Sequence, residues 1–201
     1  SYTRFLQKAG FDIKNLGVNG STTEEMLNRY KRYQNLKEKE DLLIIFGGTN
    51  DFMNGKSLEF VEENLKSILN ISQARKTMLI SPPYIEEEKT FSFYEGVNRK
   101  LKALEEKTHR ADYYIRASQI DGHYLDGIHL ASDFHQNLAR EIEKILGEEI
   151  DRNSKWANSR YPRKNSFHIR VGKKSANLKI SFNPDNDSNR ASILTVSYTH
   201  L

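Results

Sequence analysis

The sequence predicts an α/β fold built on a mostly parallel sheet, and three observations carry that prediction. Strand-like and helix-like segments alternate along residues 1–147. One strand-like segment, Asp41–Phe46, is apolar along almost its whole length, as expected of a strand buried on both faces. Glycine-containing blocks follow the strand-like segments, at the carboxyl ends where such sheets gather their functional groups.

The first half of the chain supplies two strands and two helices, and the chain already begins inside a helix-like segment at Ser1. Phe11–Leu16 is a short strand candidate, and Asp41–Phe46 is the second strand, ending in two glycines. Between them, Thr22–Lys39 is predicted to be a helix, because Thr22 and Glu25 match a capping box and apolar residues recur on one face. The next helix is marked by Leu58, Val61, Leu65, Ile68 and Leu69.

The second half continues the same alternation. Thr77–Ser81 is the next strand, which two prolines end, and Phe91–Thr108 is read as a helix. Tyr113–Ala117 is the last strand of this series. The closing helix, Ser132–Leu146, has an apolar stripe, and Gly147 after it is typical of a helix end.

Composition changes after residue 150, where Asn, Ser, Lys and Arg replace the helix–strand alternation. We therefore divide the chain into an α/β domain (1–147), a linker (148–165) and a partial β-rich accessory segment (166–201). Within that segment, Ser166–Val171 and Asn177–Phe182 alternate like short strands. The last nine residues, 193–201, form either another strand or an artefact of the gene sequence.

Charge and composition narrow the classes of function. The chain has no cysteine, which excludes disulfides, a cysteine nucleophile and thiolate metal sites. No run of eighteen apolar residues occurs, so no membrane span is predicted. The net charge of +4 is concentrated in residues 151–201, which carry 10 Lys+Arg and 3 Asp+Glu. That tail could contact an anionic surface, although a solvated linker is the simpler interpretation, and we do not expect a nucleic-acid partner.

Asp126 and His129 lie three residues apart in a glycine-containing loop after the last expected strand of the α/β domain. A histidine that accepts a proton in acyl transfer needs a carboxylate on its other ring nitrogen, which fixes the tautomer and stabilises the imidazolium. The spacing lets both side chains face one site. The pattern is loose, because Glu106 and His109 repeat it in a segment that we interpret as a charged helix surface.

A metal site is the alternative interpretation of this loop, because six carboxylate and imidazole side chains crowd into fifteen residues. They are Asp121, His123, Asp126, His129, Asp133 and His135. Metal-binding helices place two histidines four residues apart on one face. The spacings here run from a loop into a helix, so we expect the side chains to diverge, and we predict neither a metal nor another cofactor.

Two glycine-bearing blocks follow earlier strands. In residues 47–51 the glycines let the backbone approach a ligand, and the Asn50 amide could donate to a developing oxyanion. In residues 15–23 the Gly20 N–H would point outward from a helix N-terminus, where anionic oxygen is favoured. Ordinary turns favour the same residue types in both blocks, and we read Ser21 as a helix cap.

Taken together, the three blocks resemble those of the SGNH (GDSL-type) hydrolase family. The family's N-x-G-x-x-G, G-x-N-D and D-x-x-H blocks are similar to Asn15–Gly20, Gly48–Asp51 and Asp126–His129, and the resemblance covers residues 1–147. It implies a three-layer α/β/α, flavodoxin-like fold. It also implies hydrolysis of a small-molecule or glycan ester through a covalent acyl-enzyme.

The resemblance also implies a role for each site residue. His129 would be the general base, and Asp126 its orienting carboxylate. Asn50 and the Gly20 N–H would be the oxyanion donors, each worth on the order of 10²–10³ in rate. These four residues are the predicted catalytic site.

One block of the family pattern is missing. The family's nucleophile belongs to a Gly-Asp-Ser block on its first strand, and no Gly-Asp-Ser occurs in this sequence. That strand would lie inside the sheet, so without it Phe11–Leu16 would lack a neighbour. We therefore expect an N-terminally truncated domain that lacks the nucleophilic serine and hydrolyses esters little or not at all. The alternative is an inactive domain of this fold that binds carbohydrate or adheres to a surface.

Overall fold

Five parallel strands form the central layer of the protein, in the order β1-β5-β2-β3-β4. The computed structural model describes residues 1–36, 40–90, 94–107, 109–160 and 192–197. The strands are β1 (Asp12–Asn15), β2 (Leu42–Phe46), β3 (Lys76–Ser81), β4 (Tyr113–Arg116) and β5 (Ser192–Ser197). Because all five run in the same direction, their carboxyl ends meet at one edge of the sheet.

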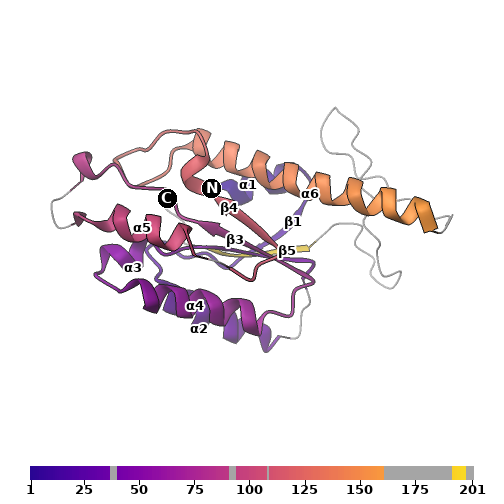
Figure 1. The fold of residues 1–201 in the computed structure, drawn as a ribbon, viewed down its shortest axis with the longest axis horizontal. Coiled ribbons are helices and arrows are strands. Elements are labelled where there is room, and N and C mark those ends of the chain that lie inside the picture. Colours follow the sequence, from indigo (N-terminus) through magenta and orange to yellow (C-terminus); the bar gives the residue numbers. More distant parts are fainter. Residues whose placement is uncertain (37–39, 91–93, 108, 161–191, 198–201) are drawn as a thin grey trace.

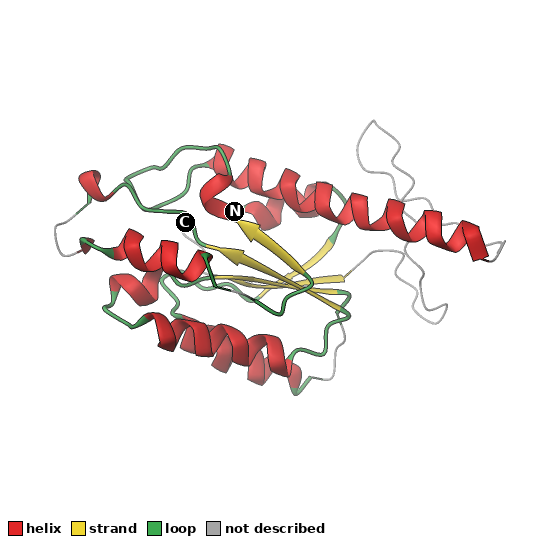
Figure 2. Cartoon of the chain, in the orientation of Figure 1, coloured by secondary structure: helices red, strands yellow, loops and turns green. Residues whose placement is uncertain are grey.

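Helices cover both faces of this sheet, as Figures 1 and 2 show. One face carries α1 (Tyr2–Lys8) and α6 (Ser132–Arg160), which pack against each other. The other face carries α2 (Thr23–Gln34), α3 (Thr49–Met53), α4 (Leu58–Ile71) and α5 (Val97–Glu105). The predicted three-layer α/β/α fold is confirmed. Within the described residues, no helix is both long and apolar enough to cross a membrane.

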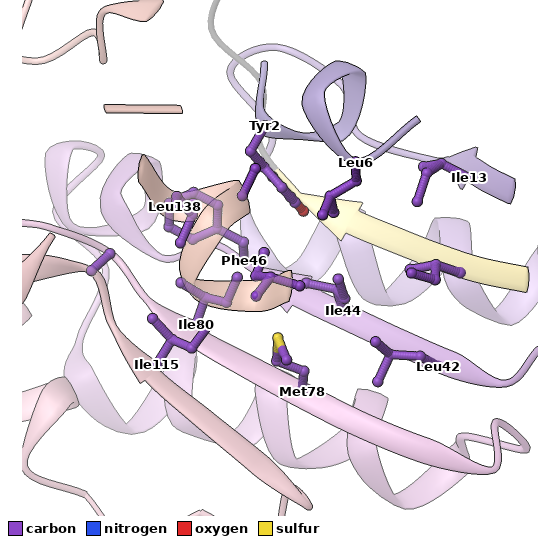
Figure 3. Packing of buried hydrophobic residues seen from close by; sticks show 14 of the residues in the cluster. Tyr2, Leu6, Ile13, Leu42, Ile44, Phe46, Met78, Ile80, Ile115 and Leu138 are labelled. Atoms are coloured by element: carbon purple, nitrogen blue, oxygen red, sulfur yellow. The ribbon is translucent and has the colours of Figure 1, made fainter. Parts of the chain in front are cut away.

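Strand β2 shows why the sheet requires both helix layers. Its five residues are all buried, and successive side chains point to opposite faces. Leu42, Ile44 and Phe46 join a cluster with side chains of α1 and α6, part of which is drawn in Figure 3. Leu43 and Ile45 join a second cluster, formed with α2, α4 and α5. The continuous apolar run in the sequence therefore serves two hydrophobic cores.

Strand β5 fills the position beside β1 that was expected to be empty. Ser192–Ser197 pairs with β1 on one side and with β2 on the other, in parallel register with both. The Leu16 N–H donates to the Thr195 carbonyl at 2.9 Å, and the Thr195 hydroxyl bonds to Asn15 Oδ1 at 2.9 Å. The expectation that Phe11–Leu16 lacks a neighbour is therefore wrong, because a strand distant in the sequence satisfies its backbone groups.

Three helices differ in extent from the sequence prediction. Helix α2 ends at Gln34 rather than at residue 39, and α5 is shorter than 91–108. Helix α6 continues through Gly147 to Arg160, so the helix end predicted at Gly147 is wrong. Gly147 does not adopt the positive φ of a helix end, and the residues directly after it favour a helix. The two strands predicted at 166–171 and 177–182 lie outside the described residues.

Candidate active site

The loop after β4 folds back on itself and presents Asp126 and His129 near its tip. Tyr124 and Leu130 form an antiparallel bridge, and the Leu125 N–H donates to the His129 carbonyl at 2.7 Å. Gly127 turns the chain at the tip with φ of +85°, a backbone conformation that residues other than glycine rarely adopt. The D-x-x-H spacing thus becomes a tight turn that brings its two ends together.

The Asp126 carboxylate holds the His129 ring and backbone at the same time. Its Oδ1 accepts from the His129 N–H at 2.8 Å and from the Ile128 N–H at 3.1 Å, and its Oδ2 contacts His129 Nδ1. The His129 backbone N–H is the largest cause that lowers the pKa of Asp126 to about 2; the His129 ring and the Ile128 N–H add to it. Asp126 is therefore ionised at neutral pH, as an orienting carboxylate must be.

The loop after β3 supports this turn from one side. The Glu86 N–H donates to the Gly127 carbonyl at 2.8 Å, and the Tyr124 hydroxyl donates to the Tyr84 carbonyl. A Cβ added at Gly127 would lie 3.1 Å from Lys89 Cβ, so the two loops are closely packed there. The position of the Asp126–His129 turn is thus fixed by contacts that lie about forty residues away in the chain.

A second histidine–carboxylate pair joins the same loop to the first turn of α6, and the sequence did not predict it. His123 Nδ1 is 2.6 Å from Asp133 Oδ2, and the backbone N–H of His123 also donates to that carboxylate. The His123 side chain lowers the pKa of Asp133. Ten residues separate the partners, so no local motif signals the pair; the folding back of the loop onto the start of α6 creates it. In the described part of the chain, no three His, Asp or Glu side chains are grouped as a metal site.

Asn50 lies on the first turn of α3, directly after β2, and is buried. Its side-chain amide donates to the Ser21 carbonyl at 3.0 Å, which ties the end of β2 to the turn after β1. Gly20 is in that turn, exposed, with φ of +71°; its N–H makes no hydrogen bond within the described residues. The two predicted oxyanion donors therefore lie on adjoining segments.

Asp51 explains the rest of the G-x-N-D block. It is completely buried, and its two oxygens accept from the backbone N–H and the hydroxyl of Thr23 at 2.9 Å and 2.8 Å. Burial raises the pKa of this carboxyl, while the Thr23 donors oppose the rise. Asn64 donates to the same Thr23 hydroxyl at 3.1 Å. Asp51 thus joins the start of α2 to α3 and so holds Asn50 beside the Gly20 turn.

Two sequence interpretations near the site are corrected. The cap of α2 is Thr22, whose capping box with Glu25 is present, whereas the buried Ser21 hydroxyl accepts from Arg29 Nη2 at 2.9 Å. His109 is not on a helix surface, because α5 ends at Glu105. Its ring lies 5.1 Å from that of Tyr114, and its buried Nε2 has no partner in the described residues.

The structure therefore joins the four predicted site residues as two groups. Asp126 contacts His129 directly after β4, and Asn50 is bonded to the turn of Gly20 after β1. Both groups follow the carboxyl ends of parallel strands and so belong to the same edge of the sheet. An imidazole held by an ionised carboxylate, with amide donors at that edge, suits proton transfer and oxyanion stabilisation in acyl transfer.

Comparison with known proteins agrees with this arrangement. The model of the GDSL-like Lipase/Acylhydrolase family matches residues 1–137. No curated protein gives a significant match. One solved crystal structure superposes with a TM-score of 0.50 at 14% sequence identity, covering 67% of this chain and 76% of that one, which supports the fold alone. Because the family model covers more than half of its length, the chain belongs to the GDSL-like lipase/acylhydrolase family of hydrolases.

Proposed function

We propose that this domain provides the acid–base pair and the oxyanion donors of a serine ester hydrolase. The observation that carries the proposal is the contact between Asp126 and His129 Nδ1. With its proton on Nδ1, His129 keeps the lone pair on Nε2, which is the arrangement that a general base requires. The ionised state of Asp126 supports the same assignment, because it stabilises the imidazolium formed in the reaction.

The proposed reaction has two balanced steps. In the first, a serine oxygen forms a bond to the ester carbonyl carbon while His129 Nε2 takes the serine proton; the carbonyl electrons move to the oxygen beside Asn50 and the Gly20 N–H. The alcohol then leaves with the proton from His129. In the second step, a water oxygen forms a bond to the acyl carbonyl carbon while His129 Nε2 takes a proton from the water. The bond to the serine oxygen then breaks, which releases the acid, and the serine oxygen takes the proton from His129.

The proposed nucleophile is the serine of a Gly-Asp-Ser block, which these 201 residues do not contain. We therefore expect the 201-residue chain to hydrolyse p-nitrophenyl acetate no faster than its own His129→Ala variant. Turnover by this chain that His129→Ala abolishes would contradict the assignment of the nucleophile, while still supporting His129 as the base.

The base is tested in a version of the chain that lacks residues 192–201 and is preceded by a strand ending in Gly-Asp-Ser, because β5 occupies the position between β1 and β2 that this strand would take. We expect this version to hydrolyse p-nitrophenyl acetate, and His129→Ala to lower kcat by about 10²–10⁴-fold. The same extension ending in Gly-Asp-Ala should be inactive. His123→Ala is the matched control, because it removes the other carboxylate-bound imidazole of the loop.

Two outcomes would count against the proposal. Equal losses of kcat in His123→Ala and His129→Ala would mean that both substitutions act by disturbing the loop, and not that His129 is the general base. Absence of turnover together with binding of an acylated glycan would favour the alternative of an inactive binding domain.

A further inference from the structure

A pocket of about 360 Å³ opens at the Gly20 turn, and Gly20 is the part of its lining that the proposed hydrolysis uses. One wall is the turn after β1, with Gly20 and Ser21. The other wall is α2, from Glu25 to Arg32. The side chains that α2 contributes are Glu25, Asn28, Arg29 and Arg32. The spacings of three and four residues place these side chains on one face of the helix.

Arg29 is fixed in place by the wall that it faces. Its Nε donates to the Leu16 carbonyl at 2.8 Å and its Nη2 to the Ser21 hydroxyl at 2.9 Å, so the guanidinium bridges the two ends of the turn. A guanidinium has five N–H donors, and these two bonds use only part of them. Burial lowers the pKa of Arg29; the negative charge of Glu25 opposes this effect, and the positive charge of Arg32 adds to it.

The pocket carries more positive charge than the described residues neutralise. Neither Arg29 nor Arg32 forms an ion pair with a carboxylate in the described part of the chain. Glu25 is the acidic residue of the lining, and its Oε2 already accepts from the Thr22 N–H at 2.9 Å in the capping box. The lining thus has two cationic side chains and one anionic side chain, and a partly buried cation that forms no ion pair is stabilised by an anion, because a charge-assisted bond replaces lost hydration.

We propose that this pocket binds a carboxylate or phosphate group of the ester substrate. The inference rests on the proposed function, since it takes the Gly20 N–H as an oxyanion donor. An anionic group held by Arg29 and Arg32 would place an ester bond of the same molecule beside Gly20. The domain would then favour esters that carry a negative charge near the reacting carbonyl over neutral esters of the same size.

Binding to the 201-residue chain tests this without any turnover. The ligands are phenyl phosphate, benzoate and neutral benzamide, titrated at low salt while ¹H–¹⁵N spectra follow the Arg29 Nε–H and the Gly20 N–H. We expect both anions to shift these signals and benzamide to leave them unchanged. Arg32→Gln should weaken binding of the preferred anion about tenfold, and Arg32→Lys should weaken it less. The control is Arg4→Gln, which removes the same charge from exposed Arg4 on α1.

Several results would overturn the inference. They are equal shifts with benzamide, anion affinity unchanged in Arg32→Gln, or an equal loss in Arg4→Gln. A stronger response to phenyl phosphate than to benzoate would identify phosphate as the group, and the reverse would identify carboxylate. Because the assay measures binding, failure here with His129-dependent turnover intact would reject the pocket alone. Anion binding without His129-dependent turnover would reject the proposed function alone.

Discussion

The side-chain amide of Asn50 donates a 3.0 Å hydrogen bond to the carbonyl oxygen of Ser21. This bond connects two blocks that are twenty-nine residues apart and that follow different strands. One amide hydrogen of Asn50 is used to hold the turn, and the second has no acceptor among the residues that the structure describes. Asn50 therefore both positions the Gly20 turn and offers a donor beside it.

We expect Asn50→Ala to lower kcat by about 10²–10³-fold in the version that carries a Gly-Asp-Ser strand. The substitution removes one oxyanion donor and releases the turn that holds the other. The measurement is kcat and KM for p-nitrophenyl acetate, with the exposed Asn70→Ala on α4 as a control. A loss confined to KM would contradict the oxyanion role.

The pKa of Asp126 is expected to stay low even without its histidine. The largest cause of the value of about 2 is the backbone N–H of His129, which alanine also possesses. In His129→Ala the pKa should therefore rise only part of the way toward 3.8. Titration of the Asp126 side-chain carbon by NMR measures this, and a full return to 3.8 would contradict the backbone contribution. The stability that Asp126 adds is present above pH 3.8 and is lost as the pH falls toward 2.

His109 should make the fold less stable in acid, at a higher pH than Asp126 does. Burial lowers the pKa of His109 below 6.5, so the folded state holds the neutral ring and the unfolded state binds the proton first. Its contribution to stability is therefore present above pH 6.5 and is lost as the pH falls through the folded-state pKa. Urea unfolding at pH 7 and pH 5 should show this difference for the native chain and a smaller one for His109→Phe. An unchanged difference in the variant would assign the effect to other groups.

The contact between Asp51 and Thr23 should stabilise the fold substantially. Asp51→Ala would leave the buried Thr23 N–H and hydroxyl without this acceptor, at a cost of about 2–3 kcal/mol in the free energy of unfolding. Combining it with Thr23→Val in a double-mutant cycle should give a coupling of about 1 kcal/mol or more. Urea denaturation of the four proteins measures it, and additive effects would mean that the two side chains act independently.

Gly122 should not tolerate alanine, for a steric reason. A Cβ at this position would lie 2.5 Å from both Cα and Cβ of Phe134, near the start of α6, so the backbone would have to move. Gly10→Ala is the matched control, because Gly10 also has a positive φ but no atom within 4 Å of an added Cβ. We expect Gly122→Ala to lower Tm by several degrees more than Gly10→Ala. Equal shifts would show that backbone conformation, and not the contact with α6, limits both positions.

Most of the local structure could be predicted from the sequence because its causes are local. The capping box of Thr22 and Glu25 predicted where α2 begins, and the apolar run 41–46 predicted a strand buried on both faces. The end of α6 could not be predicted in this way. Glycine is permitted in a helix at a cost of about 1 kcal/mol, so Gly147 alone does not end one.

The site was predictable where its partners are close in the sequence. Asp126 and His129 are three residues apart, so a turn was enough to join them, and their contact was expected. The pair of His123 and Asp133 was missed, since it depends on how the loop folds against α6. The half-buried position of His109 was also missed, because the sequence does not reveal that α5 ends at Glu105.

The sequence by itself determined the family blocks, the alternation of helices and strands, and the identity of the candidate acid–base pair. The tertiary structure alone decided that β5 lies between β1 and β2, that Asn50 holds the Ser21 carbonyl, and that Arg29 faces a pocket. The physical reason is the range of the interactions. Caps, turns and periodic apolar faces depend on residues a few positions apart, whereas strand pairing, burial and uncompensated charge depend on segments that only the folded chain brings together.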